Sequence, residues 1–214
     1  SIEQSNHEFF IVSYQQDTPQ EVKNVVQDAI MIWTKMLQNI IIPITIDVHW
    51  SPLPSGNILA SAGPSYIYLF DSMYHCDALI NQMTSTDQSE EADILLFINS
   101  AFSGRWFFGN YTEEIVPDRH FDMLSVIIHE IAHGMGIIGL ISEQGRYLGD
   151  RQHLYTYDHY LLQNDNTLLM DEESIKNDNL LSSLIKQNTN QLYFKDKAHK
   201  VYNPETFSAG SSIY

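Results

Sequence analysis

The residues with the most evident chemistry are 129–133, which read His-Glu-Ile-Ala-His. Two histidines four positions apart lie one above the other on a helix face, so both imidazoles can reach one metal ion. A catalytic zinc ion takes three protein ligands plus water, and it lowers the pKa of that water from about 15.7 to about 7. Glu130 stands beside the pair and can carry the proton of the water to the leaving amine. The sequence therefore predicts zinc ligands at His129 and His133 and a general base at Glu130.

The helix that carries this motif is predicted to begin after Asp122, which can cap it, and to end at Gly134 or Gly136. On a 3.6-residue wheel its apolar residues fall on one side, and both histidines fall nearly opposite, facing a cleft. The alternative is an exposed helix that carries two histidines by chance, and random order gives the five-residue pattern roughly 0.02 times per chain. The apolar residues are Leu124, Ile127, Ile128, Ile131 and Met135.

The third metal ligand is left open by the residues themselves. A longer motif of the form HExxHxxGxxH keeps its glycine here as Gly136, but its last histidine would stand at Gly139. His153, Asp158 and His159 are alternatives within the chain. Asp158 resembles the downstream carboxylate ligand of thermolysin-like enzymes, and the competing role is a capping or hydrogen-bonded carboxylate.

Residues 129–137 resemble the active-site helix of metzincin proteases, especially the leishmanolysin-like branch. In that branch a long insertion separates the glycine from the third histidine, which follows a Gly-Ser-Ser sequence. Residues 210–214 read Gly-Ser-Ser-Ile-Tyr, so the resemblance places the third ligand just after Tyr214. Residues 92–97 and the helix that bears Trp33 are also similar to metzincin elements.

The resemblance implies an α+β fold with a twisted mixed sheet and two long helices above an active-site cleft. The catalytic part would span 1–138, and 139–214 would form a looser, mainly helical or irregular subdomain that is incomplete at its C-terminal end. A peptide substrate would bind extended along an edge strand, which we place at residues 105–108. The implied activity is that of a secreted or cell-surface zinc metalloendopeptidase. The alternative is an inactive or truncated metal-binding or protein-binding domain without a third ligand.

Periodicity predicts the remaining elements. In the first helix, Asp17 or Thr18 is expected as the cap and Pro19 in the first turn, and Val22, Val26, Ala29, Ile30, Trp33 and Leu37 form its core-facing stripe. Strands are expected at 9–14, 44–50, 65–70, 93–99 and, more weakly, 105–108; further helices at 77–83, 157–163 and 174–186.

The charge composition of the chain limits the kinds of molecule that it can bind. The chain has 27 Asp and Glu against 11 Lys and Arg, a net charge of −16, which repels nucleic acid and anionic membrane surfaces. No apolar run reaches the length of a membrane span. The one cysteine, Cys76, cannot form an intramolecular disulfide and is expected to be a small buried hydrophobe. A Ca²⁺ site in the acidic loops is left open, although no EF-hand spacing is present.

Overall fold

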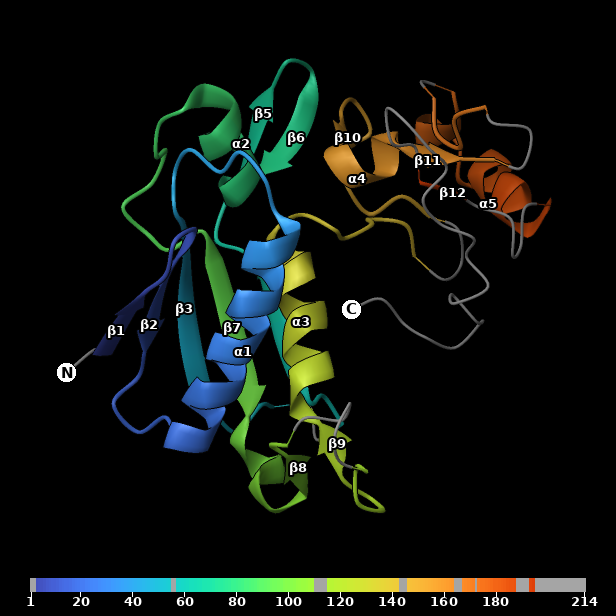
Figure 1. The fold of residues 1–214 in the computed structure, drawn as a ribbon. Coiled ribbons are helices and arrows are strands. Elements are labelled where there is room, and N and C mark those ends of the chain that lie inside the picture. Colours follow the sequence, from blue (N-terminus) through green and yellow to red (C-terminus); the bar gives the residue numbers. More distant parts are fainter. Residues whose placement is uncertain are drawn as a thin grey trace. The chain divides into compact units, whose positions relative to one another are not determined.

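The computed structural model describes residues 3–54, 57–109, 115–142, 146–163, 167–171, 173–187 and 193–194. The chain forms two compact units: unit 1 is Ser1–Ile67 with Cys76–Gly136, and unit 2 is Tyr68–His75 with Ile137–Tyr214. Residues 68–75, which the sequence analysis placed in the first part of the chain, thus belong to unit 2. Helices and several sheets occur together, so the predicted α+β class is confirmed (Figure 1).

Unit 1 is built on a five-stranded mixed sheet. Its three central strands are parallel, and the two edge strands, β1 and β4, run antiparallel to their neighbours. In spatial order the strands are β1 (Glu3–Asn6), β2 (Phe10–Tyr14), β3 (Ile44–Ser51), β7 (Ile94–Asn99) and β4 (Ala60–Pro64).

The strand predicted at 105–108 is present, but it is not an edge of the main sheet. β8 (Trp106–Phe107) pairs with β9 (Phe121–Asp122) in a separate two-stranded sheet. The chain turns away from the main sheet in the 3₁₀ helix η1 (Ser100–Arg105), which the Asn99 side chain caps by accepting from Ala101 N at 3.0 Å. The edge beside β7 is β4 instead, which periodicity missed because Ala-Ser-Ala-Gly-Pro has neither β-branched residues nor apolar alternation.

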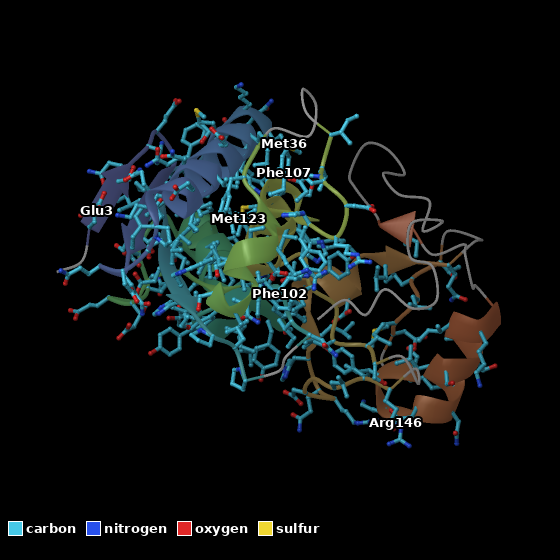
Figure 2. All side chains as sticks on the ribbon, turned by 90° about the horizontal axis from the view of Figure 1, so that it is seen from below. Glu3, Met36, Phe102, Phe107, Met123 and Arg146 are labelled. Carbon is cyan, nitrogen blue, oxygen red and sulfur yellow. The ribbon has the colours of Figure 1, made fainter. Side chains whose placement is uncertain are left out.

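One face of the central strands is fully buried under two helices. Alternate side chains of β2, β3 and β7 face α1 (Gln20–Met36) and α3 (Met123–Gly134), which pack side by side on this face (Figure 1). Trp33 Nε1 of α1 donates to the Ile128 carbonyl of α3 at 3.3 Å. Met123 is buried in the interior, whereas Glu3 and Met36 are exposed (Figure 2). The strand residues that form this core are Phe10, Val12, Tyr14, Ile44, Ile46, Val48, Ile94, Leu96 and Ile98.

The predicted stripe of α1 is confirmed from Val22 to Trp33, all of whose members are buried. The predicted cap is wrong, because Pro19 is the N-cap residue and no side chain caps the helix. Thr18 is itself buried. The ring of Pro19 fixes its φ, which is −59° here. Proline has no side-chain acceptor, so the first backbone N–H groups of α1 receive no bond from the N-cap side chain.

A buried carboxylate joins the starts of β3 and β7 to α2 (Asp77–Thr84). Asp93 Oδ2 accepts from Thr45 N at 2.7 Å and from Thr45 Oγ1 at 3.0 Å, and Oδ1 accepts from Asn81 Nδ2 at 2.7 Å. Burial raises the pKa of Asp93, and the bonds from Thr45 oppose that rise. These bonds fix the position of β7, the strand on which α3 packs.

The end of α3 lies unusually close to β7. A Cβ atom on Gly134 would stand 2.3 Å from Ile94 Cγ2, so only glycine permits this approach. Gly136 has φ of 94°, a left-handed conformation that ends helices. The predicted helix, from a cap at Asp122 to Gly134, is therefore confirmed.

Unit 2 consists of short elements around a smaller core. The three-stranded sheet has the order β10 (Leu154–Tyr155), β6 (Met73–Cys76), β5 (Ile67–Phe70), and β11 (Leu161–Leu162) pairs with β12 (Tyr193–Phe194). The helices are α4 (Thr156–His159), the 3₁₀ helix η2 (Ser174–Lys176) and α5 (Asp178–Gln187). The core cluster is Tyr147, Leu169, Met170, Ile175 and Leu181.

The predicted helix at 157–163 is half correct. α4 ends at His159, and Leu161 and Leu162 pair with β12 instead of continuing the helix. The helix predicted at 174–186 is present as η2 followed by α5. None of the helices in the described part of the chain is both long and apolar enough to cross a membrane.

Replacing Gly134 by alanine tests the close packing of α3 on β7. The added methyl overlaps Ile94, so we expect the free energy of unfolding to fall by about 1–3 kcal/mol in urea denaturation, despite the higher helix propensity of alanine. A Cβ at Gly63 would meet no atom within 4 Å, so Gly63→Ala is the matched control and should be nearly neutral. In the double variant Gly134→Ala/Ile94→Ala, the loss of unfolding free energy should be smaller than the sum of the losses in the two single variants. Strictly additive losses would contradict direct contact between the two residues.

Candidate active site

The N-terminus of α3 is fixed by its cap. Asp122 Oδ2 accepts from Ser125 N at 3.3 Å and also from the Ser125 hydroxyl, which satisfies one of the free backbone donors of the first turn. Leu124, Ile127 and Ile131 are buried, as the apolar stripe predicts, while Ile128 and Met135 are half-buried. The helix therefore packs with its expected face inward, which sets the direction of its polar residues.

The structure brings His129 and His133 together. Their Nε2 atoms are 2.8 Å apart, and the rings meet edge to face with centroids 4.3 Å apart. Burial, followed by the neighbouring His133, lowers the pKa of His129. His129 is exposed, whereas His133 is only 3% exposed, although helical phase puts both histidines on the side of α3 away from its apolar stripe.

The pair fits a zinc ion as two of its ligands. Zn–N bonds of about 2.0–2.1 Å in tetrahedral geometry hold two ligand nitrogens about 3.3 Å apart. The observed 2.8 Å is a hydrogen-bond distance between the two rings, so a small ring rotation that separates the nitrogens by about 0.5 Å would make room for the metal. The two Nε2 atoms are thus close enough to share one ion after such a rotation.

Glu130 is buried between α3 and the edge of the sheet. Its Oε2 accepts from Ala62 N of β4 at 2.7 Å, and the side chain is 6% exposed. Burial raises the pKa of Glu130 to about 7, and the bond from Ala62 opposes that rise. The general base predicted from sequence is thus held by a strand that the sequence did not reveal. The one signal for β4 was its small residues, which let α3 approach.

Asp158 has a structural partner within unit 2. It is fully buried, and both of its carboxylate oxygens accept from Leu140 N, at 3.2 and 3.0 Å. Burial raises the pKa of Asp158 to about 7, and the bond from Leu140 opposes that rise. This geometry supports the hydrogen-bonded role that the sequence analysis set against a role as ligand.

The two histidine alternatives also have neighbours in unit 2. His153 Nδ1 lies 3.2 Å from Asp150 Oδ2, and its ring packs edge-on against Tyr74. His159 packs edge-on against Tyr160.

Within the described ranges, no three His, Cys, Asp or Glu side chains are grouped as a metal site requires. The described residues therefore supply neither a third ligand for the histidine pair nor a carboxylate cluster for Ca²⁺. The Gly-Ser-Ser sequence at 210–212, from which the third ligand was inferred, lies outside the described residues. Cys76 is buried, as expected.

Comparison of the chain with protein families, with curated proteins and with solved structures found no match.

The burial of Asp158 predicts a pH-dependent stability of unit 2. Its pKa is about 7 when folded against an ordinary 3.8, so between these values the folded form holds a proton that the unfolded form has released. Unfolding free energy should therefore fall as pH rises from about 4 to about 7, by up to about 4 kcal/mol, and level off above. Amide hydrogen exchange over unit 2, recorded across this pH range, measures the change in unfolding free energy. Asp158→Asn should remove this slope; an unchanged slope would contradict a buried, protonated Asp158.

Proposed function

We propose that this chain is a zinc-dependent metalloendopeptidase of the metzincin type, leishmanolysin-like. The observation that carries the proposal is the convergence of His129 and His133, with Nε2 atoms 2.8 Å apart, beside the buried Glu130. A mixed sheet with two helices on one face agrees with the resemblance. Secretion or display at the cell surface belongs to the same proposal.

The side chains divide the work between holding a metal and moving a proton. His129 and His133 supply two neutral imidazole ligands, and the third ligand lies outside the described residues. A bound zinc ion would acidify water and polarise the scissile carbonyl. Glu130 takes one proton from the attacking water, whose oxygen joins the carbonyl carbon. It then passes that proton to the leaving nitrogen as the C–N bond breaks, giving a carboxylic acid and an amine, which exchange the second proton of the water to become a carboxylate and an ammonium group.

The substrate backbone would pair with β4 rather than with residues 105–108. Leu59 O accepts from Asn99 N at 2.9 Å and Ser65 N donates to Asp93 O at 3.0 Å, so the odd-numbered residues of this segment bond toward β7. The backbone groups of Ala60 and Ala62 therefore point away from β7. Ala62 N–H holds Glu130, while Ala60 N–H and both carbonyls face an added strand. This arrangement would bring a peptide bond alongside the general base.

A second candidate function is a metal-binding or protein-binding domain without catalytic activity. It is favoured by one observation, that the described residues offer no third ligand beside the histidine pair. Two imidazoles alone bind zinc weakly. Zinc affinity and peptide cleavage, measured on one preparation, therefore distinguish the two candidates. Tight zinc binding together with cleavage supports the peptidase. The absence of cleavage, with or without bound zinc, supports the inactive domain.

Replacing His129 tests the metal site. His129 is exposed, so His129→Ala should leave the thermal unfolding temperature nearly unchanged while zinc, measured by elemental mass spectrometry after dialysis, falls from one equivalent to well below it. His120→Ala is the control, at an exposed histidine whose Nδ1 lies 3.1 Å from the carbonyl oxygen of Asp118. Equal zinc in wild type and His129→Ala would contradict the assignment.

The same assay addresses the alternative ligands of the third position. Single substitutions His153→Ala, Asp158→Asn and His159→Ala should each leave the zinc content at the wild-type value. A loss of zinc in one of them would assign the third ligand to that residue.

Replacing Glu130 by glutamine tests the general base. The amide keeps the size of the side chain but cannot accept a proton, so we expect kcat for a peptide substrate to fall by about two to four orders of magnitude with zinc content unchanged. Glu91→Gln, at an exposed carboxylate, is the control. Full proteolysis by Glu130→Gln would remove the basis for a Glu-assisted mechanism.

A further inference from the structure

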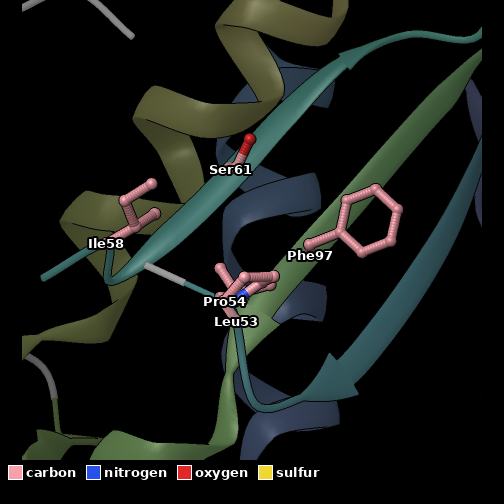
Figure 3. Close-up of a pocket in the computed structure, with 5 residues that line it drawn as sticks. All are labelled: Leu53, Pro54, Ile58, Ser61 and Phe97. Carbon is pink, nitrogen blue, oxygen red and sulfur yellow. The ribbon is translucent and has the colours of Figure 1, made fainter. Parts of the chain in front are cut away.

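The face of the unit 1 sheet opposite the helices carries a hollow of about 320 Å³ at its β4 edge. Leu53 and Pro54 close one end, Ile58 lies at the outer rim, and Ser61 and Phe97 form the floor (Figure 3). Apart from the Ser61 hydroxyl, the side chains of this lining are apolar and carry no charge. A charged group placed there would lose hydration without gaining an ionic partner from the lining.

The floor continues a row of side chains across three strands. Ser61 of β4 is the cross-strand partner of Phe97 on β7, and Phe97 is the partner of His49 on β3. The His49 and Phe97 rings stack with centroids 4.6 Å apart and planes 22° apart. At the edge strand the row ends in a small, exposed serine. The hollow is thus the space that a large side chain at position 61 would fill.

The backbone of β4 determines which residue of an added strand faces this space. Residues directly opposite on neighbouring strands share a face and have Cβ atoms about 4.5–5.5 Å apart. A peptide residue opposite Ser61 therefore places its side chain beside Ser61, from where a long chain reaches Phe97. The residues before and after it, opposite Ala60 and Ala62, place their side chains on the other face, with Glu130 and α3.

We propose that this hollow is a specificity pocket for one large apolar side chain of the substrate, such as Leu, Met, Phe or Tyr, at the position that pairs with Ser61. The inference rests on the proposed function, because it takes the substrate to be an extended peptide added to β4. Ala62, the residue after Ser61, donates its N–H to Glu130, so a peptide paired with β4 would pass both the hollow and the proposed general base. We expect a preference for a large apolar residue at the substrate position opposite Ser61. The residue preferences at the two adjacent positions should not depend on the side chain at position 61.

The test is a capped, degenerate peptide library digested by the full chain with zinc, in which mass spectrometry gives residue preferences at each position around the cleaved bond. Wild type should prefer large apolar residues over alanine or aspartate by about tenfold at one position, as burial of an apolar side chain predicts. Ser61→Leu fills the hollow, so the preference there should fall below about twofold while the adjacent positions keep theirs. Ser103→Leu, the same change at an exposed serine of η1 outside the hollow, is the matched control and should keep the wild-type preference.

A second variant covers the case in which Ser61→Leu fails to fold, which thermal unfolding would show. Ile58→Ser removes the apolar rim at a side chain that is 39% exposed, and it should weaken the same preference. Cleavage without an apolar preference, or a preference that survives both substitutions, would overturn the pocket and leave the zinc chemistry intact. If the wild type binds zinc but neither cleaves the library nor binds it in fluorescence anisotropy, both the pocket and the proposed peptidase fail.

Discussion

The close approach of α3 to the sheet is the constraint on which the site depends. Gly134 removes the one side chain that would keep the helix away from Ile94 of β7, and the small residues of β4 let the same helix reach the sheet edge. Only at this distance can Glu130 accept from Ala62 N. The Asp93 bonds to Thr45 and Asn81 hold the strand against which the helix packs. Packing in the core thereby sets the position of the polar groups.

The site places polar groups where they lower stability. Glu130 and His133 are buried, and a buried ionisable group costs free energy unless its partners compensate. One backbone donor compensates Glu130 in part, since its pKa remains raised. Apolar residues of matched size would pack more favourably here. Groups that weaken the fold locally are typical of functional sites, and their burial here supports the proposal.

The sequence predicted the elements whose side chains repeat regularly and missed those fixed by pairing. α1, β3 and α3 follow from apolar periodicity because each buries one face on the core. β4 carries no such pattern, since its role is to bond with β7 and Glu130 through the backbone. Leu161 and Leu162 continue a helical pattern but pair with β12, because a distant strand outweighs local propensity. Long-range pairing of this kind cannot be obtained from a local window.

The candidate site divides in the same way. His129 and His133 are four residues apart, so their spacing alone predicts that the two rings meet on one helix face. The burial of His133 and the bond from Ala62 to Glu130 depend on how α3 packs, which the spacing does not contain. Asp158 illustrates the converse: its sequence context allowed a ligand or a hydrogen-bonded carboxylate, and the bonds to Leu140 N favour the latter.

The two edges of the unit 1 sheet differ in how readily they accept another strand. β1 has the polar sequence Glu-Gln-Ser-Asn, and Glu3 pairs with Lys23, features that discourage indiscriminate strand addition. β4 is short and ends at Pro64, which lacks an N–H group and so cannot extend a ladder of hydrogen bonds. A peptide that pairs with β4 can therefore form only a few backbone hydrogen bonds before it reaches Pro64. Such an edge can bind a short extended segment weakly enough to release it. It cannot support the long ladder of backbone hydrogen bonds that aggregation through an edge strand requires.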